Sequence, residues 1–91
     1  MRFVVGQLVS VPCLVERCSL AGESLVTIDV EGERLSGFVR DELIEGATLR
    51  AVVRAVDDGA VTVSLPGAFF LRATDRTTIP STWAAAHLRP A

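Results

Sequence analysis

Arginine and phenylalanine side chains on two predicted strands carry the most distinctive chemistry in this sequence. Arg34, Phe38 and Arg40 share one face of the run 34–40, and Arg50 and Arg54 share one face of the run 49–56. Successive side chains of a strand alternate between its two faces, so each set points one way. Guanidinium groups bind phosphates, and an exposed aromatic ring stacks on a base. If the two strands are neighbours, these five residues predict a face that binds single-stranded RNA or DNA.

The same arginines also allow a second interpretation, a solvated face with ordinary ion pairs. The carboxylates close to them in the sequence are Glu31, Glu33, Asp41 and Glu42. Exposed ion pairs of this kind contribute less than about 1 kcal/mol. A face of this type would be inert toward nucleic acid, or would meet a protein partner.

Metal ligands and catalytic nucleophiles are too few and too scattered to form a recognisable site. Cys13, Cys18 and His87 are zinc-type ligands, but they lack a second paired motif. No serine or cysteine stands in a nucleophile motif with His87, and Asp57 and Asp58 belong to a turn. We therefore predict that the protein is not an enzyme and uses no metal, cofactor or small-molecule substrate.

Large apolar residues gather after position 67, beyond the part of the chain that looks like a complete domain. They are Phe69, Phe70, Leu71, Ile79 and Trp83. Phenylalanine and tryptophan are favoured anchors of protein interfaces, and a large exposed apolar patch marks an interaction site. Two interpretations remain open: these side chains fold back onto their own domain, or they dock on a neighbouring protein.

The elements that must position these residues are predicted to be short strands. Alternating apolar residues define five runs, at 3–15, 25–30, 34–40, 49–56 and 60–65. An Asp-Asp-Gly turn at 57–59 joins the last two runs into a hairpin, and Gly37 suits a bulge or sharp bend. The pattern predicts an all-β fold, a small five-stranded barrel over residues 1–67. OB-like topology is preferred, and SH3-like topology is the alternative.

Residues 68–91 are predicted to form a C-terminal extension that ends in a short helix. Ser81 is suited to cap a helix over residues 82–89, and Pro90 ends it.

Residues 6–65 carry a series of short motifs in an order typical of one family of small barrels. They are Gly6, Gly37-Phe38-Val39, Asp41-Glu42-Leu43, Gly46, and the valine-rich runs 52–57 and 61–65. In this order the segment resembles the RNA-binding OB domain of the ribosomal S-one type. The resemblance implies an OB barrel whose second and third strands bind nucleic acid. Phe38 matches one aromatic position of that face, while Thr27 and Asp29 stand on the second strand.

Composition favours a protein partner over nucleic acid. The chain has 91 residues, a net charge of −2 and a pI near 5.2. These values argue against a protein that binds a polyanion over its whole surface. One Phe supplies a single stacking contact, worth roughly 1–3 kcal/mol per base. All nine basic residues are arginine, as in proteins from GC-rich genomes.

The predicted function is therefore a non-enzymatic structural or adaptor subunit of a larger protein assembly. A phage virion head or tail component from a GC-rich host is one setting. Weak single-stranded RNA or DNA binding is the alternative.

No apolar run approaches the ~20 residues needed to span a bilayer, and the N-terminal residues lack a signal peptide's apolar region. We expect no membrane partner and a location in the cytoplasm or in a particle assembled there.

Overall fold

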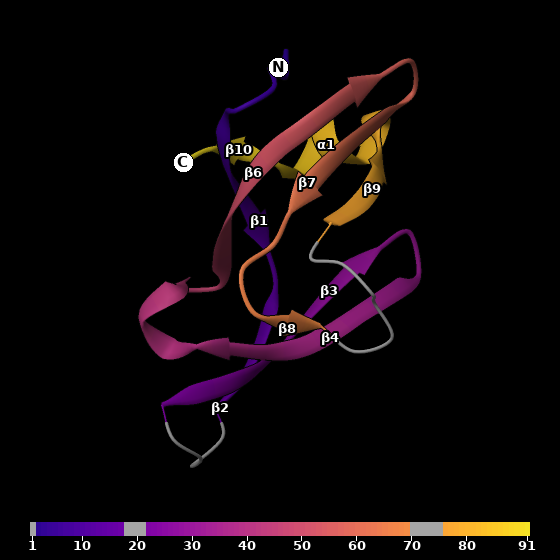
Figure 1. Ribbon diagram of the computed structural model, residues 1–91. Helices are drawn as coiled ribbons and strands as arrows, with labels where there is room; N and C mark the ends of the chain where they lie inside the picture. The colour runs from indigo at the N-terminus through magenta and orange to yellow at the C-terminus, as the bar shows by residue number, and fades with distance from the viewer. Residues whose placement is uncertain (1, 18–21, 70–75) are drawn as a thin grey trace.

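The computed structural model describes residues 2–17, 22–69 and 76–91, without the side chains of Arg17, Ala68 and Phe69. The described residues form two antiparallel sheets, a 3-10 turn and one C-terminal helix (Figure 1). The mostly β fold with a short C-terminal helix confirms the coarse prediction. The elements in chain order are β1 (Leu8–Pro12), β2 (Leu14–Arg17), β3 (Glu23–Val30), β4 (Glu33–Arg40), η1 (Asp41–Leu43), β5 (Ile44–Glu45), β6 (Thr48–Asp57), β7 (Ala60–Ser64), β8 (Ala68–Phe69), β9 (Arg76–Pro80), α1 (Ser81–His87) and β10 (Arg89–Pro90).

The strands divide into a large sheet and a small sheet. The large sheet has the order β10-β1-β6-β7-β9, with β5 paired to β6, and the small sheet has the order β2-β3-β4-β8. The chain passes from the large sheet to the small sheet twice. It does so between β1 and β2 at Cys13, and between β7 and β8 over residues 65–67.

The predicted closed barrel is wrong, because the two sheets are open. A barrel closes only when every strand edge is paired. Here β9 ends the large sheet, and β4 pairs with β8 only at Gly37 and Phe38. The corners of the chain connect the sheets, but the ladder of paired strands does not run all the way round.

A single apolar core lies between the sheets and includes side chains from both. Val9, Leu49 and Val63 of the large sheet are fully buried, as are Val26 and Val39 of the small sheet. Each of these residues is one of the alternating apolar residues that define the predicted runs, and therefore belongs to the face expected to point inward. The pattern therefore placed most inward side chains correctly, although it placed them in a barrel.

Irregular positions in the strands differ from those expected. Gly37 is an ordinary ladder residue paired with Val26, not a bulge. The register shift occurs in β6 between Val53 and Ala55, which makes Arg54 the extra residue. Two residues join β3 to β4, and both Glu31 and Gly32 have positive φ, 51° and 84°. This is the backbone of a type I′ turn, whose twist matches that of the flanking strands.

The described parts of the C-terminal extension, residues 68–69 and 76–91, contribute strands to both sheets. β8 pairs with β4, β9 pairs with β7, and β10 pairs with β1. The helix α1 ends at His87, two residues before the predicted end, because Leu88 is extended and enters the core at 0% exposure. Ile79, Trp83 and Leu88 of the predicted C-terminal extension therefore belong to the same core cluster as residues of 1–67.

Candidate binding surfaces

The five residues predicted to form one nucleic-acid-binding face lie on two different sheets. Arg34, Phe38 and Arg40 lie on the outer face of the small sheet, where the alternate residues of β4 are buried. Arg50 and Arg54 belong to β6 in the large sheet, which does not neighbour β4. The structure therefore brings together the first three residues and the last two, but not all five.

On the small sheet, the arginines are paired with carboxylates. Arg34 Nε lies 3.5 Å from Asp29 Oδ2 on the neighbouring strand, and Arg40 Nε lies 3.1 Å from Glu42 Oε1. Phe38 is half-buried and stands opposite Leu25. This is the arrangement expected of a solvated face with ordinary ion pairs.

Asp41, which the sequence offered as a partner for these arginines, accepts a hydrogen bond from the buried hydroxyl of Ser24. Its backbone N–H donates to the carbonyl of Gly22 at 2.8 Å. A buried hydroxyl requires such a partner, because leaving it unpaired costs about 1–3 kcal/mol. Asp41 therefore anchors the start of η1 to β3.

The outer face of the large sheet collects arginines that sequence reasoning treated separately or missed. Arg89 of β10 stands beside Ser10 of β1, and Ser10 stands opposite Arg50 of β6. Directly paired residues of an antiparallel sheet share a face. Arg89 and Arg50 therefore lie on the same face, with one strand between them.

Two more arginines lie farther along this face. Val52 of β6 is paired with Ser64 of β7, which is paired with Arg76 of β9. The bulged Arg54 lies on the same side, because its Nε donates a 2.9 Å hydrogen bond to Ser64 Oγ. Arg76 and Arg89 gave no signal in the sequence, because the short strands that carry them were not predicted.

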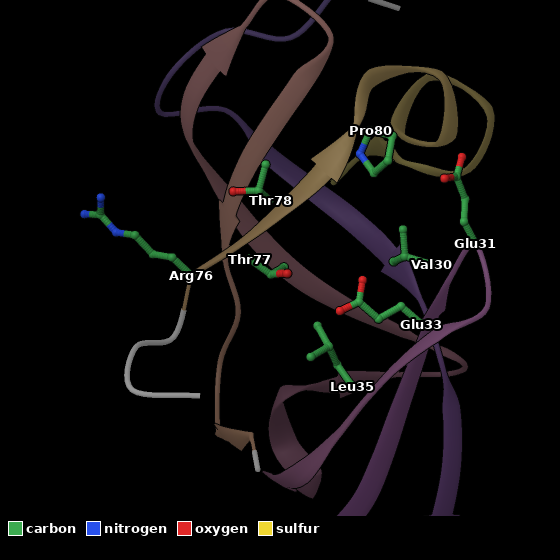
Figure 2. A pocket seen from close by; sticks show the side chains of 8 residues that line it. All are labelled: Val30, Glu31, Glu33, Leu35, Arg76, Thr77, Thr78 and Pro80. Carbon is green, nitrogen blue, oxygen red and sulfur yellow. The ribbon is translucent and has the colours of Figure 1, made fainter. Parts of the chain in front are cut away.

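A groove lies where the two open sheets face each other (Figure 2). It has a volume of about 320 Å³, and its lining residues are Val30, Glu31, Glu33, Leu35, Arg76, Thr77, Thr78 and Pro80. The side chains of Glu33 and Leu35 project into it from β4, and that of Thr77 projects from β9. Among the described residues, β9 pairs with no strand on this side, and β4 pairs there only with β8. Exposed strand edges of this kind can pair with another chain.

The apolar tail residues divide between the core and the undescribed part of the chain. Ile79 is 1% exposed and Trp83 is 9% exposed, and both belong to the core cluster. Of the two interpretations left open by the sequence, the first holds for these two residues, because they pack within their own chain. The backbone of Phe69 lies in β8, while Phe70 and Leu71 fall outside the described residues.

A second, smaller pocket brings Cys13, Asp29 and His87 to one place beside Trp83. The rings of Trp83 and His87 are stacked, with centroids 4.4 Å apart. His87 Nδ1 lies 3.0 Å from the carbonyl oxygen of Trp83, and because a carbonyl only accepts, Nδ1 carries the hydrogen.

This pocket lacks the features of a nucleophile or metal site. Burial raises the pKa of the half-buried Cys13 thiol, which is the opposite of what activates a nucleophile. No group of three His, Cys, Asp or Glu residues in the described ranges could hold a metal ion. Cys18, the remaining predicted zinc-type ligand, lies outside those ranges.

Comparison with family models, curated proteins and solved structures gave no match to any of the three. In the part of the chain that the structure describes, no helix is long and apolar enough to cross a bilayer. The resemblance to the S-one type of OB domain therefore stays a prediction from the sequence.

Proposed function

We propose that the protein is a non-enzymatic structural or adaptor subunit that binds an extended segment of a partner protein in the groove between β4 and β9. The observation that carries this proposal is the pair of strand edges that border one groove. An extended peptide can add to an exposed sheet edge through its main chain, while pockets in the groove select its side chains.

The edge of β9 has its hydrogen-bonding groups in place. Ser81 N–H donates to the carbonyl of Gly59 at 3.0 Å, on the β7 side of the strand. Antiparallel ladders alternate between residues that face the partner strand and residues that face away. The backbone N–H and C=O of Ile79 and Thr77 thus point toward β7. Those of Thr78 point away from β7, toward the groove.

Charge favours a basic segment as the occupant, because the lining has two glutamates and one arginine, Arg76, whose side chain extends away from the others (Figure 2). Glu31 and Glu33 line one side of the groove and are both exposed, while Leu35 lies at 8% exposure on its floor. A segment with an apolar residue over Leu35 and a lysine or arginine near the carboxylates complements this lining. No described feature singles out a virion among protein assemblies, so the proposal concerns a protein-binding subunit in general.

The proposal for a non-enzymatic role rests on the smaller pocket. Its cysteine has a raised pKa, and the Nδ1–H of its histidine is held by a carbonyl oxygen. The raised pKa leaves little of the thiolate that nucleophilic catalysis by a cysteine needs, whereas the histidine does not decide the question, because an Nδ1–H leaves Nε2 able to accept a proton.

The test uses Thr78→Pro, which removes the outward N–H of Thr78 at an edge position that tolerates proline. Thr78→Ala is the matched control, because it removes the side chain and keeps the N–H. Peptides selected on the wild-type protein from a displayed library of random short sequences should be enriched in basic residues. We expect Thr78→Pro to weaken their binding about tenfold or more, equivalent to about 1.4 kcal/mol, and Thr78→Ala to change it little.

The same variants should be compared by light scattering over a range of concentrations, since a second copy could supply the segment. Selection that yields no peptide, or peptides indifferent to Thr78→Pro, would contradict the proposal.

A further inference from the structure

The outer face of the large sheet is basic, although the chain as a whole is acidic. It carries Arg50, Arg54, Arg76 and Arg89, which come from three strands, β6, β9 and β10. The four arginines share a face because β9 and β10 pair with the large sheet. The sequence predicted neither of these two strands.

Among the described strand residues, two carboxylates lie on this face, Glu45 of β5 and Asp57 at the turn end of β6. Glu45 Oε1 lies 2.8 Å from Arg50 Nη2, so Arg50 is ion-paired like the arginines of the small sheet. Counted over the described residues, four arginines and two carboxylates leave a charge of +2 on the face. The whole chain has a charge of −2, so the remainder carries −4. A uniform acidic surface would repel a polyanion, but a face of opposite sign can bind one.

The centre of the face is apolar. Leu8 is 45% exposed and is paired with the half-buried Val52, between the Arg50–Arg89 side and the Arg54–Arg76 side. Neighbouring strands lie about 4.8 Å apart, so arginines two strands apart are separated by about 10 Å. This layout offers charged contacts on either side of a small apolar surface.

We propose that this face binds single-stranded nucleic acid through its phosphates. Guanidinium groups make paired hydrogen bonds to phosphate oxygens, and the unpaired bases of a single strand can lie on Leu8 and Val52. Among the described residues of the face there is no aromatic side chain, so binding depends on phosphate contacts and shows little sequence preference. This surface is separate from the small-sheet face predicted from Arg34 and Phe38.

The inference does not depend on the proposed protein-binding groove. Arg76 alone belongs to both surfaces, so the test variant leaves it intact. Arg50→Gln combined with Arg89→Gln removes two charges from the large-sheet face. Arg34→Gln combined with Arg40→Gln removes two charges from the small-sheet face and is the matched control. Both variants have the same net charge, and Arg34, Arg40 and Arg50 all lose a surface ion pair of similar kind.

The measurement is fluorescence anisotropy of a labelled thymidine oligonucleotide, titrated at several salt concentrations. For single strands, the logarithm of the affinity falls with the logarithm of salt concentration, with a slope of about −0.7 per phosphate contact. We expect salt-sensitive binding by the wild type. We also expect a loss of about tenfold or more in Arg50→Gln/Arg89→Gln, with a slope shallower by about 1.4, and near wild-type binding by the control variant.

Several results would overturn the inference. They are the absence of binding at low salt, equal losses in the two double variants, or tighter binding to a duplex of the same length. Equal binding to polyglutamate would show that the face accepts any polyanion, which also rejects a nucleic-acid site. Circular dichroism of both variants verifies that they are folded, and Thr78→Pro should leave oligonucleotide binding unchanged.

Discussion

Gly67 illustrates how a single residue determines the corner between the two sheets. It lies in the segment between β7 and β8 with φ of +99°. A Cβ placed there would lie 2.7 Å from the carbonyl oxygen of Phe38 and 2.8 Å from Val39 Cγ2. The backbone of the corner therefore passes over β4 at a distance that only glycine allows.

We predict that Gly67→Ala destabilises the protein more than Gly59→Ala does. Both glycines have φ near +90°, so both substitutions strain the backbone by about 1–3 kcal/mol. Only Gly67 has atoms close to the added methyl group, while Gly59 has none within 4 Å. Urea unfolding of the two variants measures the difference. Equal losses in free energy of unfolding would show that the corner relaxes without cost.

Individual residues also show how far the sequence could predict the candidate surfaces. The alternation along 34–40 and 49–56 placed Arg34, Phe38 and Arg50 on outer faces correctly. It could not show that the two runs lie in different sheets, because strand pairing is a property of distant residues. Arg89 stands on a two-residue strand whose second residue is Pro90, and no local pattern identifies such a strand.

At the scale of elements, α1 and β10 depend on the residue between them. Leu88 follows the last helical residue, adopts φ −79° and ψ 144°, and is fully buried. Its N–H still donates to the carbonyl of Ala84 at 2.9 Å. The helix ends because this side chain enters the core, and the extended backbone then leads into β10.

We predict that Leu88→Ala lowers the free energy of unfolding by about 2–5 kcal/mol, the usual cost of removing a buried leucine side chain. Ala86→Ser, at an exposed position of the same helix, should change it by about 0.5 kcal/mol or less. Chemical denaturation followed by circular dichroism provides the measurement. A small effect of Leu88→Ala would mean that residues 81–90 contribute little to the core.

The elements that the sequence predicted well are those with several apolar residues at a spacing of two. β3, β4, β6 and β7 fall within two residues of the runs expected for them. β9 was missed, since its sequence Arg-Thr-Thr-Ile-Pro has one large apolar residue and a proline. Its strand conformation comes from pairing with β7, which is a tertiary effect.

For the whole molecule, two open sheets share one core, and this has a consequence for stability. The core cluster contains Val9 of the large sheet, Ile28 of the small sheet and Trp83 of the helix. Loss of any one element exposes apolar surface belonging to the others. The alternation predicted the inward strand residues of this core, such as Val9 and Ile28, but it left the packing of Ile79 and Trp83 open and did not predict the open arrangement. Closure depends on where β8 and β9 pair, and local patterns do not contain that information.

We predict a single cooperative unfolding transition. Trp83 is the sole tryptophan of the chain, so its fluorescence reports on the C-terminal helix, while far-UV circular dichroism reports mainly on the sheets. Coincident thermal transitions from the two probes are expected of a two-state domain. If the fluorescence transition comes first, the helix unfolds separately from the sheets.

The pairing of β1 has a consequence for synthesis of the chain. The hydrogen-bonded neighbours of β1 come from residues 48–57 on one side and from residues 89–90 on the other. A ribosome adds about 5–20 residues each second, and it must release residue 90 before β1 can gain its second neighbour. The large sheet is therefore completed only after this segment is translated, and until then one edge of β1 has no paired strand.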